Sequence, residues 1–281
     1  MQSLQHFAID VLRLTLWLVI LTAVFVPLER LFALRDARAW RRQSGVDLGY
    51  YFLSSLLPAA LLALPMALFA TALGHLLPAS VMTWSSNLPV WARWSLALVV
   101  AELGTYWGHR WSHEIPLLWR FHAVHHSAEH MDWLVNTRAH PVDMVFVRLC
   151  GLVPVYALGL VQVSGGKAQS VAIALATTFW GFAVHANVRW RFGWLEQLVA
   201  TPAFHHWHHT RHEHIDRNYA TMFPWMDRLF GTLHLPQQWP REYGTETPVA
   251  ANLPRQIIDP FRRVPRTPDH SSTGRSSADR R

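Results

Sequence analysis

Histidine is the residue type in this sequence best suited to bind a transition metal, and it is unevenly distributed. Thirteen of the 18 histidines fall in two windows, residues 107–140 and 205–214. His109 and His113 are four residues apart, so on a helix both imidazoles project from one face. Each window also contains one His-x-x-His-His pattern, at 122–126 and at 205–209. One helical turn of either pattern presents three ring nitrogens that can be divided between two neighbouring metal ions.

Imidazole binds iron, zinc, copper and nickel, so the ligand type alone does not identify the metal. The number of histidines is more informative, because a single zinc ion needs only three or four ligands. Eight histidines in three motifs therefore favour a binuclear centre. Beside apolar helices, such a centre fits redox chemistry on a buried hydrocarbon better than hydrolysis. Cys150 is the only cysteine, which excludes an intrachain disulfide and a thiolate-rich metal site.

The composition outside the histidine motifs indicates a membrane protein. Of the 281 residues, 51% are hydrophobic and only 15% are charged, which is too apolar for an ordinary soluble domain. Apolar segments at 11–28, 48–73, 90–107, 144–163 and 168–188 have the length of membrane-spanning helices. A turn signal at 164–167 makes the last two a helical hairpin. The sequence therefore predicts an all-α fold, a polytopic membrane bundle of about five spans or segments.

The charge distribution predicts the orientation of this bundle. In residues 29–42, after the first apolar segment, five arginines outnumber two acidic residues: Arg30, Arg35, Arg38, Arg41 and Arg42 against Glu29 and Asp36. By the positive-inside rule this loop is cytoplasmic. Counting spans from it places both histidine windows in one cytoplasmic, helical, histidine-rich cap. The net charge of +7 forms no basic face with interleaved aromatic residues, so we expect no nucleic-acid partner.

The predicted organisation has three regions. Residues 1–88 are N-terminal membrane spans, and residues 89–240 are a catalytic region that contains further spans and the histidine motifs. Residues 241–281 are a C-terminal segment. This segment is expected to be disordered from about residue 262, because it consists of Ser, Arg, Pro and Asp with almost no apolar residue.

The histidine motifs resemble those of the fatty acid hydroxylase and sterol desaturase superfamily. The family pattern is Asp/Glu-x-x-x-Tyr-x-x-His-Arg-x-x-His, then Leu-Trp-Arg-x-His-x-x-His-His, a His-Pro pair, and His-x-x-His-His followed by Asp-x-Asn-Tyr-Gly. The matching residues here are Glu102, Tyr106, His109, Arg110, His113, Leu118, Trp119, Arg120, His122, His125, His126, His140, Pro141, His205, His208, His209, Asp216, Asn218 and Tyr219. The resemblance covers about residues 102–231, with Ala220 where the family often has glycine.

This resemblance implies a membrane-bound oxidoreductase that uses two iron ions and dioxygen to hydroxylate or desaturate a lipid, with zinc as an alternative metal. We favour hydroxylation. The implied metal ligands are His109, His113, His122, His125, His126, His185, His205, His208 and His209. Some fatty acid hydroxylases have a further histidine where this chain has Gly181. The sequence contains no dinucleotide-binding, haem-attachment or iron-sulfur motif, so we expect a separate electron-donor protein.

Several polar residues are candidates for supporting the ligands. Glu102 lies two helical turns before His109 in an apolar segment, where a carboxylate is costly unless it is paired. We therefore predict a catalytic-site role for Glu102, accepting a hydrogen bond from a ligand imidazole or a nearby arginine. The other predicted supporting residues are His140, Tyr106, Asp216 and Asn218, with Asp143 a weaker candidate.

Ligation stays open for His140, His206 and His212. Pro141 biases His140 away from a helical conformation, so a structural role is as compatible with its position as ligation. His206 is offset from the face that its neighbours share. His212 and His214 are expected to be solvated.

Two other functions are compatible with a membrane metal site. A zinc-dependent membrane lipid hydrolase would need an open metal position and a general base, but not so many imidazoles. A membrane metal transporter would place its ligands near the bilayer midplane, whereas these motifs lie in polar sequence beyond the apolar segments. A lipid oxygenase is therefore favoured. The apolar segments do not identify the lipid, and the sequence carries no signal for the oligomeric state.

Overall fold

The computed structural model describes residues 2–36, 40–160 and 167–262. Regular structure in these residues is helical, with two isolated bridge pairs, Ala33 with Val188 and Thr210 with Tyr243, and no strand. The predicted all-α class is therefore confirmed. The predicted disorder beyond residue 262 and the turn at 164–166 lie outside the described residues, and the three region boundaries stay predictions.

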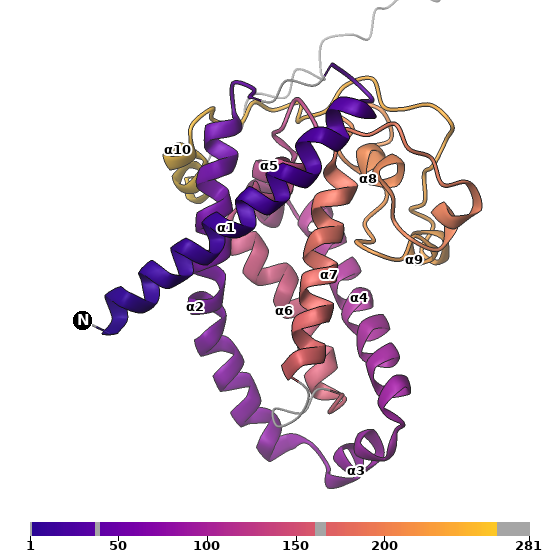
Figure 1. Ribbon diagram of the computed structural model, residues 1–281. Coiled ribbons are helices and arrows are strands. Elements are labelled where there is room, and N and C mark those ends of the chain that lie inside the picture. Colours follow the sequence, from indigo (N-terminus) through magenta and orange to yellow (C-terminus); the bar gives the residue numbers. More distant parts are fainter. Residues whose placement is uncertain (1, 37–39, 161–166, 263–281) are drawn as a thin grey trace, which may run out of the picture.

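The five longest helices occupy the five apolar segments predicted from the sequence. They are α1 (Gln2–Leu31), α2 (Ser44–Leu76), α4 (Val90–Glu114), α6 (Pro141–Ala157) and α7 (Lys167–His185). The short helix α3 (Ala79–Asn87) connects α2 to α4 at one end of the bundle (Figure 1). In the described residues, two helices are long and apolar enough to cross a membrane, over Leu4–Leu31 and Ser44–Leu73.

Short helices form a cap at the opposite end of the bundle (Figure 1). They are α5 (Pro116–His126), η1 (Trp133–Thr137), η2 (Gly193–Gln197), α8 (Pro202–His208), α9 (Trp225–Leu229), α10 (Leu253–Ile258) and η3 (Asp259–Phe261). Several begin with proline in the first turn, where its missing N–H costs nothing. At α8 the Thr201 hydroxyl also accepts from the amide of Phe204.

Helices α4 and α6 approach each other closely at three glycines. A methyl group at Gly104 would lie 2.1 Å from the carbonyl oxygen of Cys150, and one at Gly151 would lie 2.6 Å from the Thr105 hydroxyl. Gly108 faces the Cys150 side chain. Small residues let helix backbones come this near. The contact brings the histidine-bearing end of α4 beside the first turn of α6.

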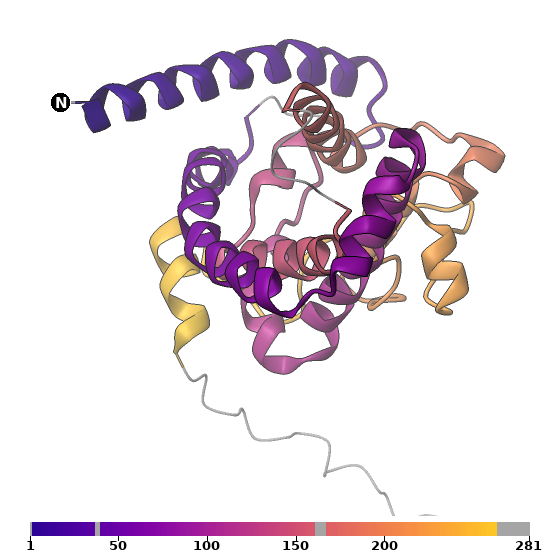
Figure 2. The same ribbon diagram turned by 90° about the horizontal axis from the view of Figure 1, so that it is seen from below.

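Helix α1 lies across one side of the bundle, beside α7 (Figures 1 and 2). Its Phe25 ring packs against Trp133 of the cap and Phe179 of α7, with ring centroids 5.8 and 5.2 Å apart. At the cap end of α1, the buried Glu29 carboxylate accepts from the amides of Trp133 and Asn187. These contacts attach α1 to the cap.

The arginine-rich loop after α1 is bound to the cap by buried ion pairs. Arg41 contacts both Asp132 and Asp47. Asp47 also contacts Arg138, 2.5 Å from its Nε, and both side chains are fully buried. Arg35 donates to the carbonyl oxygen of Pro240. Arg35 and Arg41, which the sequence indicated only as a signal of orientation, also hold the first helix pair against the cap.

Candidate metal centre

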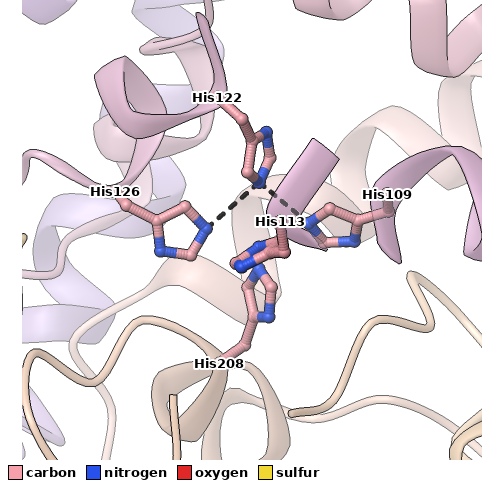
Figure 3. A group of neighbouring side chains, drawn as sticks. All are labelled: His109, His113, His122, His126 and His208. Carbon is pink, nitrogen blue, oxygen red and sulfur yellow. Dashed lines mark hydrogen bonds between the residues drawn. The ribbon is translucent and has the colours of Figure 1, made fainter. Parts of the chain in front are cut away.

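Nine histidine rings meet in the cap in two neighbouring groups. The first group consists of His109, His113, His122, His126 and His208, and the second of His125, His185, His205 and His209. Within each group the candidate ligand atoms all lie within 4.8 Å of one another. Figure 3 shows the five rings of the first group converging from α4, α5 and α8 on a shared space. The groups touch, because the rings of His126 and His209 stack 4.5 Å apart.

The two His-x-x-His-His patterns are shared between the groups in a crossed manner. On α5, His122 and His126 belong to the first group and His125 to the second. At α8 the assignment is reversed, since His205 and His209 belong to the second group and His208 to the first. Residues at i and i+4 lie on one helix face, and the residue at i+3 is offset from the i+4 position by about 100°. Each pattern therefore contributes to both groups.

Six of the nine rings are oriented by an oxygen atom at Nδ1. The acceptors are the carbonyl oxygens of Tyr219 for His109, Arg138 for His125, Gly181 for His185 and Arg217 for His208, and the carboxylates of Asp216 for His113 and Asp143 for His122. These distances are 2.7–3.2 Å. Metal-binding histidines are commonly held in this way, which fixes the tautomer and turns Nε2 toward the ion.

Pairs of these rings have their Nε2 atoms close together, and neither Nε2 atom of a pair carries a proton that could form a hydrogen bond. His109 donates from Nδ1 to a carbonyl oxygen at 2.7 Å, and His122 donates to a carboxylate at 2.9 Å. A neutral imidazole with its proton on Nδ1 has a lone pair on Nε2. Yet the two Nε2 atoms lie 3.1 Å apart. Two lone pairs at this distance repel each other unless a cation lies between them, so the arrangement fits a metal ion.

The second group repeats this arrangement. His125 and His185 both donate from Nδ1 to carbonyl oxygens, and their Nε2 atoms lie 3.4 Å apart. The His185 and His205 Nε2 atoms are 2.9 Å apart. Nitrogens bound to one ion at about 2.1 Å are about 3.0 Å apart at a right angle and about 3.4 Å apart at a tetrahedral angle. The ring spacing therefore matches shared ligation.

Burial lowers the pKa of several clustered histidines, which favours their neutral form and keeps their lone pairs available. It lowers the pKa of His125 to about 3, with a further lowering by the neighbouring His122 ring. Burial also takes the pKa of His126, His208 and His209 well below the usual value. The Nε2 of His208 is buried and has no hydrogen-bond partner among the described residues. Such a nitrogen is costly unless it binds something.

A single loop orients three rings of the first group. Asp216 contacts His113, the next residue's carbonyl accepts from His208, and the Tyr219 carbonyl accepts from His109. Asp216 and Asn218 have φ values of 62° and 59°, a conformation that Asp and Asn tolerate better than most residues. The Asn218 side chain bonds the backbone of Phe204 and His234. Asn218 is thus a structural support of the loop.

In the described part of the chain, Glu102 hydrogen-bonds neither a clustered imidazole nor an arginine, so the partner expected from the sequence is wrong. Its carboxylate accepts from the amides of Thr221 and Met222 at 2.8 and 2.6 Å and from the Thr221 hydroxyl. These groups directly follow the loop that orients the first group. The Glu102 carboxylate in the apolar helix is therefore paired with backbone amides of the cap. Through these hydrogen bonds Glu102 supports the loop.

Tyr106 also supports this loop, and its hydrogen bonds and ring contacts to other described residues include none of the nine clustered histidines. It is buried, its hydroxyl lies 2.8 Å from the Thr232 hydroxyl, and its ring stacks on Phe230. Thr232 in turn donates to Asp227, which accepts from the amide of Tyr219. Burial raises the pKa of Asp227 to about 6, and three hydrogen bonds to it act in the opposite direction.

The histidines whose roles were open lie outside both groups. His140 caps α6 by accepting from the amide of Val142, and its Nε2 contacts the carbonyl oxygen of Ile257. His206 is buried between the Tyr243 hydroxyl and the carbonyl oxygen of Ala186. His212 is half exposed beside two surface glutamates, as expected for a solvated residue.

Two supporting residues gave little or no signal in the sequence. Asp143, considered only as a weak candidate, orients His122 and accepts from Ser112 across the α4–α6 contact. Arg138, which was not singled out, is fully buried, and its carbonyl oxygen orients His125. Spacing could not reveal either one, because each partnership depends on how separate elements pack.

A cavity of about 800 Å³ opens onto the first group from the cap side. His113, His126 and His208 form part of its wall, together with Trp119 of α5 and the segment 244–262.

A family comparison identifies the region that contains this centre. The model of the fatty acid hydroxylase family matches residues 94–232, which include all nine clustered histidines. Residues 94–232 belong to the fatty acid hydroxylase family. The resemblance seen in the sequence motifs is therefore confirmed, and the region carries a histidine cluster able to bind metal.

Individual relatives of this fatty acid hydroxylase region are named as lipid-modifying enzymes. The chain is 35% identical to the ornithine lipid hydroxylase of Rhizobium tropici, covering 64% of this chain and 54% of the relative. It is 32% identical to the alkylglycerol monooxygenase of Danio rerio over 60% of this chain and 35% of the relative. A Delta(7)-sterol 5(6)-desaturase of Gibberella zeae is 27% identical over 50% and 41%. The chain thus spans about half or less of these relatives' length. No solved structure matches it.

Proposed function

We propose that this chain is a membrane-bound, non-haem di-iron oxygenase that hydroxylates a lipid, with desaturation as the alternative outcome. The proposal rests on the paired Nε2 lone pairs within each histidine group, which fit a metal ion and not a hydrogen bond. Relatives named as a hydroxylase, a monooxygenase and a desaturase of lipids or sterols support the reaction class.

The nine clustered histidines would hold two iron ions, five in the first group and four in the second. When bound, the iron pair would supply the activation of dioxygen that removes hydrogen from an unactivated C–H bond. The chain's own part is to fix the rings and to keep water away. Asp143 and the loop at 216–219 would hold the rings of the first group in one orientation, so that little reorganisation accompanies the reaction.

We further propose that α1, α2, α4, α6 and α7 are membrane segments and that the cap lies on the cytoplasmic side. One end of each of these five helices lies at the cap, as Figure 1 shows. The arginine-rich loop lies at the same end and is bound to the cap through Arg35 and Arg41. By the positive-inside rule, that end faces the cytoplasm. Labelling of single cysteines placed in the cap and in α3, in a Cys150→Ser background, tests this orientation.

Electrons would come from a separate donor protein, because the sequence contains no motif for a redox cofactor other than the histidine centre. The decisive experiment is metal analysis of the purified full-length chain, followed by mass spectrometry of lipids incubated with it, dioxygen and a chemical or protein reductant. We expect about two irons per chain and a product heavier by one oxygen atom. Isotopically labelled dioxygen should deliver that atom.

Two results would overturn the proposal. Zinc alone, with a product that forms without dioxygen, would indicate a hydrolase. Metal uptake into sealed vesicles, without any change in lipid, would indicate a transporter. Loss of two hydrogen atoms from the lipid in a dioxygen-dependent reaction would keep the di-iron oxygenase and assign desaturation as the outcome.

A further inference from the structure

A second cavity, of about 760 Å³, lies on the bundle side of the histidine cluster. Its walls come from α1, α2, η1, α6 and α7. At its inner end lie Gly181, whose carbonyl accepts from His185, and Thr137, which precedes the residue that orients His125. This cavity therefore adjoins the backbone of the second group, whereas the cap cavity opens onto the first. In the described residues the two cavities share no lining residue.

The wall of this bundle cavity is mainly apolar. Leu14, Trp17 and Leu21 of α1 line it together with Phe179 and Phe182 of α7. The serines of α2 that reach it are already bonded to the backbone, Ser54 to the carbonyl oxygen of Thr137 and Ser55 to that of Tyr51. The apolar side chains of this wall would accept a hydrocarbon chain, because the two serine hydroxyls are already used in backbone hydrogen bonds.

One strongly charged side chain lines this cavity. Arg148 lies seven residues into α6, roughly 10 Å from the cap end of that helix. Its side chain is exposed to the cavity, and no carboxylate among the described residues lies within ion-pair distance. Two charged groups at the cap end of the bundle are paired: Glu102 accepts from cap amides, and Arg138 contacts Asp47.

An unpaired arginine in a membrane helix is costly and marks a site where a partner binds. The guanidinium group is always charged, and its fork of N–H donors matches the two oxygens of a carboxylate or phosphate. The bilayer supplies molecules that combine such an anion with a long apolar chain. The cavity combines the complementary features: an apolar wall and Arg148, which has no carboxylate partner in the described part of the chain.

We propose that the bundle cavity is a lipid-binding site and that Arg148 pairs with the oxygen anion, carboxylate or phosphate, of an anionic bilayer lipid. This inference rests on the proposed function and deepens it, because the bound lipid would lie beside the backbone segments that orient the second histidine group. Arg148 then selects anionic over neutral lipids, and the distance between its guanidinium group and the histidines determines which carbon of the lipid reaches the metal centre.

The test measures binding without turnover, by native mass spectrometry of the full-length chain released from detergent. The probes are oleate, dioleoylphosphatidate and dioleoylglycerol, which carry a carboxylate, a phosphate and no anion. We expect Arg148→Gln to weaken the two anionic probes by roughly tenfold or more, while dioleoylglycerol is unaffected. Arg148→Lys should keep part of the preference, because a lysine offers charge without the fork.

Two matched variants complete the design. Arg93→Gln removes another arginine in a bundle helix, one that does not line the cavity, and should leave all three probes unchanged. Ala176→Phe narrows the cavity and should weaken all three probes alike. Metal content and the gel-filtration profile verify that each variant is folded. If oleate or phosphatidate alone depends on Arg148, that result identifies which anion is recognised.

The inference is overturned if the folded Arg148→Gln chain retains the preference of the parent for anionic probes. It is also overturned if Ala176→Phe binds every probe as the parent does. A failed oxygenase assay leaves this test intact, because binding is read without reductant or dioxygen. Conversely, lipid oxidation that is indifferent to Arg148 would keep the proposed function and reject the cavity as its anion site.

Discussion

The two histidine groups differ in how their rings are held. In the first group, carboxylates of Asp143 and Asp216 orient two rings, and backbone carbonyls orient two more. In the second, the two Nδ1 contacts are to backbone carbonyls, those of Arg138 and Gly181. A carboxylate makes an imidazole a stronger ligand than a carbonyl does. The ring orientation of the first group thus depends in part on side chains that a single substitution can remove, whereas that of the second depends on how the backbone is packed.

Removing a ligand should have the largest effect, and adjacent residues of α5 test the crossed arrangement. We expect His125→Ala to remove the metal of the second group and His126→Ala that of the first. Either variant should lower turnover by at least roughly a thousandfold, because the charge stabilisation that each ion supplies is lost. Metal analysis with Mössbauer spectroscopy distinguishes the two sites. His212→Ala, at a half-exposed position in the same cap, serves as the control.

If both α5 variants removed the same ion, the division of the rings into two groups would be wrong. If His212→Ala lowered the metal content as much as either, the effect would not be specific to the clustered rings.

The next largest effect concerns the packing on which the second group depends. Asp47→Asn leaves Arg41 and Arg138 without their shared, fully buried carboxylate. Breaking a buried ion pair in this way costs about 3–5 kcal/mol of unfolding free energy. We expect a lower Tm in detergent and earlier loss of the second ion, because Arg138 orients His125. Asp259→Asn, at a more exposed pair with Arg255, should change the Tm little. Equal loss of both ions would contradict this dependence.

A smaller effect is expected where a side chain orients the first group. Asp143→Asn keeps the shape of the side chain but removes the charge that His122 donates to. Loss of such a partner lowers metal affinity or activity by about 10–100-fold. Metal titration of the stripped protein should show weaker binding at the first site only. Ser112→Ala removes a donor to the same carboxylate and should give a much smaller change. Weaker binding at the second site instead would contradict the assignment of Asp143 to the first group.

The smallest effect is expected at Asp216, the other carboxylate of the first group. It is 54% exposed and lies 3.2 Å from His113, so water can replace part of its contact. We expect Asp216→Asn to lower metal affinity by less than about tenfold. An effect larger than that of Asp143→Asn, in the same titration, would contradict the weaker role expected for the exposed carboxylate.

The sequence predicted the long helices and the grouping of the histidines because both signals are local. Apolar length located the five long helices, and the spacing of His122, His125 and His126 predicted a turn divided between two sites, as the two histidine groups divide it. Spacing could not reveal Arg138 and Asp47, which meet across 91 residues. The same limit explains Glu102, whose need for a partner was correctly inferred but whose partners come from a loop 119 residues away.

The crossed patterns have a consequence for assembly. Each group takes rings from both α5 and α8, and α8 follows α5 only after α6 and α7 have been made. A growing polypeptide that has passed His126 but not His208 can complete neither site. Any ions that these groups bind would therefore enter only after α8 has been made, and the two groups become complete together.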